Sequence, residues 1–190
     1  MNTVQHELES TGAQTPKATW MMILRLACNI FAHPVLVTTY FTSHLASSHR
    51  GILTQLLITS LLAHDTQVRQ TAASLAFNCS TRVMAERLQN EKDNGDAQED
   101  DDWQVEIVSA VVDALSKETD PDITHKLLAC LSKLLFLAPA NSSLPDLLSV
   151  LDVCGTIDGK KKDAIISSTP VVELARDIHL MIDKSLSDKL

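Results

Sequence analysis

Nucleophilic catalysis in this chain would have to use one of its four cysteines, with one of its seven histidines as the general base. A thiol becomes an efficient nucleophile when a base lies within hydrogen-bonding reach. The combinations that the sequence suggests join Cys28 or Cys79 with His33 or His44. The residues around them do not match a known signature of cysteine enzymes. We therefore expect a protein that is not an enzyme.

The cysteines also lack the spacing of a metal site. Cys28, Cys79, Cys130 and Cys154 lie far apart, and no two of them form a Cys-x-x-Cys pair. Zinc sites usually take their ligands from such short spacings, and the histidines are scattered along the chain. Three of the cysteines fall on apolar faces of predicted helices, so we expect reduced, buried thiols. Neither a metal nor another cofactor is expected.

The acidic residues are concentrated in one stretch, residues 90–102. The formal net charge is −8, and leaving out the seven acids of this stretch and Lys92 takes it to −2. The remainder is nearly neutral, whereas DNA or RNA binding requires clustered Lys and Arg. The apolar runs are too short to predict a membrane span or a secretory signal. We expect a monomer of the cytoplasm or nucleus that binds neither nucleic acid nor membrane.

The composition favours helices, because the chain has only five glycines and 4% aromatic residues. Apolar residues recur every three or four positions, which predicts amphipathic helices. Thr19 is expected to cap the first of them. About nine helices are predicted, at residues 20–33, 34–45, 48–62, 68–78, 80–89, 103–117, 121–135, 145–153 and 171–186. The predicted fold class is all-α, an armadillo/HEAT-like helical repeat array (an α-α superhelix).

Two aspartates mark the starts of corresponding helices. Asp65 precedes one predicted helix, and Asp120 with Pro121 precedes another; aspartate is a favoured helix N-cap and proline a favoured first residue. The segments 64–68 and 119–123 correspond at a separation of 55 residues. Removing the acidic insertion leaves roughly the 40 to 47 residues of an armadillo or HEAT unit. A short array of two or three repeats is therefore predicted.

Three predicted helices carry a pattern that resembles the PUL domain. In the first, the family's Leu-Arg, Asn and Phe occur at Leu24, Arg25, Asn29 and Phe31. In the second, the family's Leu-Ala-x-Asn-x-Ser occurs at residues 75–80. In the third the family reads Arg-Leu-Leu-x-Ala-x-Gly, and this chain has Lys126, Cys130 and Ser132 in place of the Arg, Ala and Gly. The resemblance covers about residues 19–182, and we expect them to correspond to the later two-thirds of such a domain.

The resemblance implies a protein-binding function. PUL domains occur at the C-terminus of phospholipase-activating protein and its fungal counterparts, and are fused to thioredoxin-like or PPPDE peptidase modules in other proteins. They dock the acidic, aromatic-containing C-terminal tail of the AAA ATPase valosin-containing protein, which unfolds ubiquitinated proteins. The implied organisation is a disordered leader at residues 1–17 and a PUL-like armadillo-type domain at residues 18–187, with a mobile acidic loop at residues 90–102.

Four residues are predicted to contact the peptide, namely Arg25, Asn29, Asn78 and Lys126. The resemblance places cations at the positions of Arg25 and Lys126 along the groove that receives the tail. From the residues alone, Arg25 interrupts an apolar helix and must pair with an internal carboxylate or face a groove. Lys126 is either a solvated edge residue or a ligand of the tail. The two asparagines either cap helix C-termini or hydrogen-bond an extended peptide.

Other functions fit the same sequence. The chain could be a generic helical-repeat scaffold for another peptide partner, bound for example through the acidic loop. It could also be the non-catalytic portion of a thioredoxin or PPPDE-peptidase fusion. A pull-down with and without the ATPase tail peptide distinguishes the first of these from tail binding.

Overall fold

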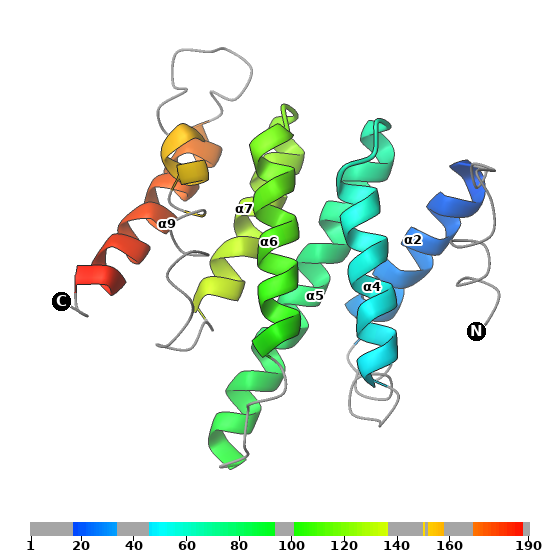
Figure 1. The fold of residues 1–190 in the computed structure, drawn as a ribbon, viewed down its shortest axis with the longest axis horizontal. Helices are drawn as coiled ribbons and strands as arrows, with labels where there is room; N and C mark the ends of the chain where they lie inside the picture. The colour runs from blue at the N-terminus through cyan, green and yellow to red at the C-terminus, as the bar shows by residue number, and fades with distance from the viewer. Residues whose placement is uncertain are drawn as a thin grey trace. The chain divides into compact units, whose positions relative to one another are not determined.

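The structure is a computed structural model, and it describes residues 17–33, 46–93, 101–136, 150, 152–157 and 169–187. Every regular element among these residues is an α-helix (Figure 1). The helices are α2 (Lys17–Ala32), α4 (Ala46–Leu61), α5 (Thr66–Asp93), α6 (Asp101–Lys117), α7 (Pro121–Phe136) and α9 (Thr169–Ser187). Residues 152–157 are also helical. The predicted all-α class is confirmed, and none of the described helices is long and apolar enough to cross a bilayer.

The chain divides into two compact units, Met1–Leu75 and Ala76–Leu190. The division falls inside α5, so the first turns of this helix belong to one unit and the remainder to the other. Each unit has its own buried apolar residues, and each is described by itself below.

In the first unit, α2 contacts the end of α4 and the start of α5. The indole Nε1–H of Trp20 donates to the buried Ser60 hydroxyl at 3.0 Å, and the Cys28 thiol donates to the Thr71 carbonyl at 3.4 Å. These bonds satisfy polar groups that would be costly to bury alone. The core between the helices is formed by apolar residues that include Leu24, Leu57 and Leu75. Phe31, at 8% exposure, is a core residue.

In the second unit, α7 is the central helix and packs against both α6 and α9. Its apolar stripe is fully buried at Leu127, Leu128, Leu131 and Leu134. Burying one such side chain is worth about 1.5–3 kcal/mol, so this stripe contributes substantially to the stability of the unit. The thiol of Cys130, on the same helix, donates to the Ala76 carbonyl of α5 at 3.4 Å.

The predicted repeat is visible in the helix starts. The Asp65 carboxylate accepts the N–H groups of Gln67 and Val68 at 3.0 and 3.2 Å. The Asp120 carboxylate accepts the N–H groups of Asp122 and Ile123 at 2.9 and 3.1 Å. These two residues lie 55 positions after Gln67 and Val68. The same separation relates the buried positions 68, 72, 73, 75, 76 and 79 of α5 to 123, 127, 128, 130, 131 and 134 of α7. Both the caps and the core faces of α5 and α7 are therefore in one register.

Several predicted boundaries differ from the structure. The helix predicted at residues 80–89 is not separate, because α5 runs unbroken from Thr66 to Asp93. The hydroxyls of Ser80 and Thr81 both donate to the Phe77 carbonyl at 2.8 Å, so these polar residues are accommodated within the helix. Thr19 is not a cap, since α2 begins at Lys17.

Other predictions fall at or beyond the edges of the described residues. The helix predicted to end at residue 153 continues further, because residues 152–157 are helical. Of the acidic stretch, the ends belong to α5 and α6, and residues 94–100 lie outside the described residues. Residues 1–16 of the predicted leader and the predicted helix at residues 34–45 also lie outside them. The described part of the chain therefore does not test the predicted count of nine helices.

Candidate functional site

One face of α2 combines a cation with exposed apolar side chains. Met22 and Leu26 are 65% and 60% exposed, and Arg25 and Asn29 are exposed beside them. Residues spaced by three, four and seven positions lie on the same face of a helix. The opposite face of α2 is buried in the core of the first unit, which fixes the direction in which these four side chains point. We call these four residues the α2 stripe.

Arg25 was predicted either to pair with an internal carboxylate or to face a ligand. Its side chain is exposed, and it forms no ion pair with any residue in the described ranges. The internal pair is therefore not found among these residues. A guanidinium presents a planar set of donors that can bind both oxygens of one carboxylate. At this position it can take a carboxylate supplied from outside.

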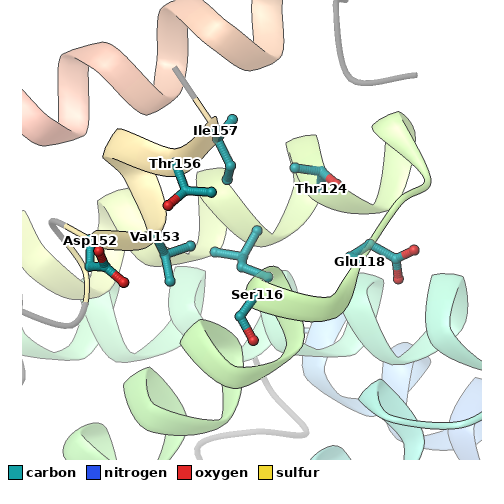
Figure 2. Close-up of a pocket in the computed structure, with 8 residues that line it drawn as sticks. Ser116, Glu118, Thr124, Asp152, Val153, Thr156 and Ile157 are labelled. Atoms are coloured by element: carbon teal, nitrogen blue, oxygen red, sulfur yellow. The ribbon is translucent and has the colours of Figure 1, made fainter. Parts of the chain in front are cut away.

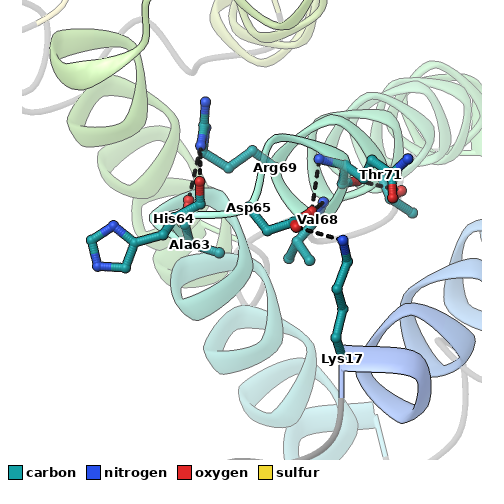
Figure 3. Close-up of polar contacts among 8 residues, drawn as sticks. Lys17, Ala63, His64, Asp65, Val68, Arg69 and Thr71 are labelled. Carbon is teal, nitrogen blue, oxygen red and sulfur yellow. Dashed lines mark hydrogen bonds and ion pairs between the residues drawn. The ribbon is translucent and has the colours of Figure 1, made fainter.

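Two basic side chains of the first unit, Lys17 and Arg69, bind groups within the protein (Figure 3). Lys17 forms an ion pair with the capping carboxylate of Asp65 at 2.5 Å. The guanidinium of Arg69 donates to the carbonyls of Ala63 and His64 at 3.1 and 2.9 Å, beyond the end of α4. The hydrogen bond from Lys17, opposed in part by desolvation, lowers the pKa of Asp65. These two cations hold the corner between α4 and α5, which distinguishes them from Arg25.

Asn29 and Asn78 do not have the same environment. Asn29 is exposed in the last turn of α2, whereas Asn78 is half-buried in the middle of the long helix α5. Asn78 therefore does not cap a helix C-terminus. Lys126 is half-buried on α7, and both it and Asn78 already interact with other groups of the protein. Arg25 and Asn29 belong to the first unit, and Asn78 and Lys126 belong to the second.

The sequence analysis did not single out Lys133, which the second unit places in a defined setting. Its ammonium lies 3.5 Å from the centroid of the Phe77 ring and donates to the Thr81 hydroxyl at 2.7 Å. Lys133 forms no ion pair with a carboxylate in the described ranges. Its only sequence signal is the spacing of seven from Lys126, which places both cations on one face of α7.

Burial affects the charges around Lys133. Desolvation lowers the pKa of the Lys133 ammonium. Desolvation also raises the pKa of the neighbouring Cys130 thiol to about 12, so this thiol is neutral at physiological pH. The Lys133 charge is therefore not balanced by a thiolate at Cys130. A partly desolvated cation of this kind interacts more strongly with an anion than a fully solvated one.

The thiols do not resemble activated nucleophiles. All four cysteines are free, and Cys79, Cys130 and Cys154 are fully buried, in agreement with the prediction of reduced core thiols. Cys28 is half-buried instead, and its thiol donates to the Thr71 carbonyl. Burial raises the pKa of Cys154 to about 12. Raised pKa values keep thiols protonated and unreactive.

The second unit also contains a cavity of about 240 Å³ between the end of α6, the start of α7 and residues 152–157 (Figure 2). Its acidic lining residues are Glu118 and Asp152. The Glu118 carboxylate accepts the N–H groups of Thr119 and Asp120 at 2.9 and 3.0 Å, so it holds the turn before α7. An acidic lining suits an amine or hydroxyl group. It does not suit an acidic peptide.

The repeated caps and buried faces of α5 and α7 define a helical-repeat domain. The family model of the PUL domain matches residues 1–177, and the chain belongs to the PUL domain family. This confirms the resemblance predicted from the three helical motifs, and PUL domains are helical protein-interaction domains. No curated protein and no solved structure matches the chain.

Proposed function

We propose that this PUL domain binds the acidic C-terminal tail of the AAA ATPase valosin-containing protein. It acts as a non-catalytic adaptor of the ubiquitin-proteasome pathway in the cytoplasm or nucleus. The peptide-contacting residues are Arg25, Asn29, Asn78 and Lys126. The observation that carries the proposal is the α2 stripe, in which an arginine without an ion pair among the described residues lies between two exposed apolar side chains.

The α2 stripe supports a tail that is both acidic and aromatic. Micromolar affinity requires about 8 kcal/mol, whereas an exposed charge pair contributes only about 0.2–1 kcal/mol. The cation alone is therefore insufficient. Met22 and Leu26 are more than half exposed, and covering them with an aromatic side chain would add an apolar contribution of a few kcal/mol at about 25 cal/mol per Å². In this proposal the apolar contact supplies affinity, and Arg25 selects an acidic partner.

The proposal is tested by calorimetric titration of the full chain with an acidic C-terminal peptide of the ATPase. Arg25→Ala is expected to weaken binding about fivefold, the upper end of what an exposed charge pair contributes, because the peptide carboxylate loses its bidentate donor. The helix content and the melting temperature should not change, because Arg25 is exposed. Lys117→Ala is the matched control. Lys117 is exposed, and both Lys117 and its ion-pair partner Asp113 belong to the second unit, whereas Arg25 belongs to the first. Unchanged affinity of the Arg25→Ala variant rejects the site.

The apolar part is tested separately. Leu26→Ala is expected to weaken binding about tenfold, which corresponds to about 1.4 kcal/mol. Leu180→Ala removes a leucine of nearly equal exposure, 59% against 60%, from α9. This control variant should bind like the wild type. Equal affinities for the two leucine variants would show that the exposed face of α2 is not covered by the peptide.

The absence of catalysis is tested with iodoacetamide at neutral pH. A catalytic thiolate is alkylated rapidly, whereas a protonated core thiol is not. Slow labelling of all four cysteines in the folded chain is expected, with Cys28 reacting first because it is the only half-buried one. Rapid, stoichiometric labelling of a single cysteine would contradict the non-catalytic assignment.

A further inference from the structure

Lys133 lies on α7 in a setting that orients its charge. The ammonium contacts the face of the Phe77 ring and the hydroxyl of Thr81, which are four residues apart on α5. The Thr81 hydroxyl donates its own hydrogen to the Phe77 carbonyl at 2.8 Å. Its oxygen is therefore oriented to accept a hydrogen bond from Lys133. All of these groups belong to the second unit.

We propose that Lys133, held by Phe77 and Thr81, forms a carboxylate-binding subsite for an acidic peptide. This inference rests on the proposed function, and it adds a ligand residue that the PUL motifs do not include.

The donor count of the ammonium supports the subsite. A lysine ammonium has three N–H donors and no acceptor. One donor is used by Thr81, and the contact with Phe77 occupies a second direction. A third donor is left for a ligand. Because the side chain is already held in place, less conformational entropy is lost when a carboxylate binds.

The spacing on α7 specifies what the peptide should contain. Lys126 and Lys133 are seven residues apart on one face, which is about 10.5 Å at 1.5 Å per residue. A peptide in the polyproline II conformation advances about 3.1 Å per residue and presents every third side chain on the same face. Two carboxylates three residues apart would therefore match the two cations. The second carboxylate can be an acidic side chain or the terminal carboxylate of the peptide.

The test measures the affinity of the full-length chain for the same acidic ATPase peptide. Lys133→Met keeps the aliphatic stem and removes the charge, and it is expected to weaken binding about tenfold. Lys133→Arg should retain most of the affinity. Thr81→Val removes the hydroxyl that orients the ammonium, and it should weaken binding less than Lys133→Met does. Lys117→Met is the control for loss of one positive charge. Lys133→Gln replaces the Met variant if circular dichroism shows that the latter is misfolded.

Peptide variants identify the source of the carboxylate. A peptide with an amidated C-terminus and a peptide with Glu and Asp replaced by Gln and Asn are titrated against the wild type and Lys133→Met. The peptide that lacks the relevant carboxylate should bind both chains equally. If the unmodified peptide binds both chains equally while Arg25→Ala weakens its binding, the subsite is rejected and the proposed function stands. If the wild type binds no acidic peptide, both are rejected.

Discussion

Helices α5 and α7 begin in the same way but bury different side chains. Each starts with an aspartate whose carboxylate accepts two backbone N–H groups, and their buried positions coincide at a separation of 55 residues. At three of these positions α5 has alanine where α7 has leucine, namely 72, 73 and 76 against 127, 128 and 131. The repeat therefore preserves the start and the orientation of the helix while the side-chain volume on its core face differs. In α5 the small side chains allow close approach of neighbouring groups, and in α7 the leucines fill the space themselves.

The largest effect on the free energy of unfolding is expected for a substitution of a buried leucine in α7. Leu128 is fully buried, so Leu128→Ala should lower the free energy of unfolding by about 2–5 kcal/mol through lost burial and a residual cavity. Urea denaturation followed by circular dichroism measures the change. Leu180→Ala should change it by less than about 0.5 kcal/mol, because Leu180 is 59% exposed. A small loss of unfolding free energy for Leu128→Ala would mean that neighbouring side chains move in to fill the cavity.

The converse substitution should have the next largest effect. Ala73 occupies the position in α5 that corresponds to Leu128 and is fully buried, so Ala73→Leu introduces three more carbon atoms into a filled core. We expect a loss of about 1–3 kcal/mol in the free energy of unfolding. Ala85→Leu, at an exposed position of the same helix, is the control. Unchanged stability of Ala73→Leu would show that α5 and α7 do not differ in packing as inferred.

Removing a cap should have a smaller effect. Asp120→Ala leaves the N–H groups of Asp122 and Ile123 without their acceptor. The expected loss is about 1 kcal/mol. Asp177→Ala, at an exposed position within α9, should be close to neutral. Thermal denaturation of both variants at neutral pH provides the measurement, and equal melting temperatures would argue against a stabilising cap.

The smallest effect concerns a difference between the two caps, the ion pair of Asp65 with Lys17. The pKa of Asp65 is lowered in the folded protein, chiefly by the hydrogen bond from Lys17. The stabilisation is therefore present above the ordinary aspartate pKa of about 4 and is lost as the pH falls through the lower folded value. As the pH is lowered from about 6 to about 3, the free energy of unfolding of the Lys17→Met variant should fall less than that of the wild type, because the variant lacks the ion pair with Asp65. Identical pH profiles in urea denaturation would show that the pair does not contribute.

The features that the sequence predicted are those set by local patterns. The caps at Asp65 and Asp120 and the apolar faces depend on residues a few positions apart in one helix. The unbroken course of α5 was missed, because Asn78 was interpreted as a possible C-terminal cap, whereas Ser80 and Thr81 bond back to the Phe77 carbonyl within a continuous helix.

Lys133 was missed for a different reason. Its setting is formed by Phe77 and Thr81, which are more than fifty residues away in the sequence. A contact of this kind follows from the packing of two helices against each other and has no local signature. The spacing from Lys126 could have indicated only that the two lysines share a face.

The continuity of α5 has a consequence for any attempt to divide the protein. The border between the two units, Leu75 to Ala76, is a peptide bond inside a regular helix of 28 residues. Severing the chain there would leave carbonyls at one new end and amides at the other without their helical partners. Fragments cut at this border would each have to satisfy those groups with water, so a cut at this border should destabilise both ends of the interrupted helix.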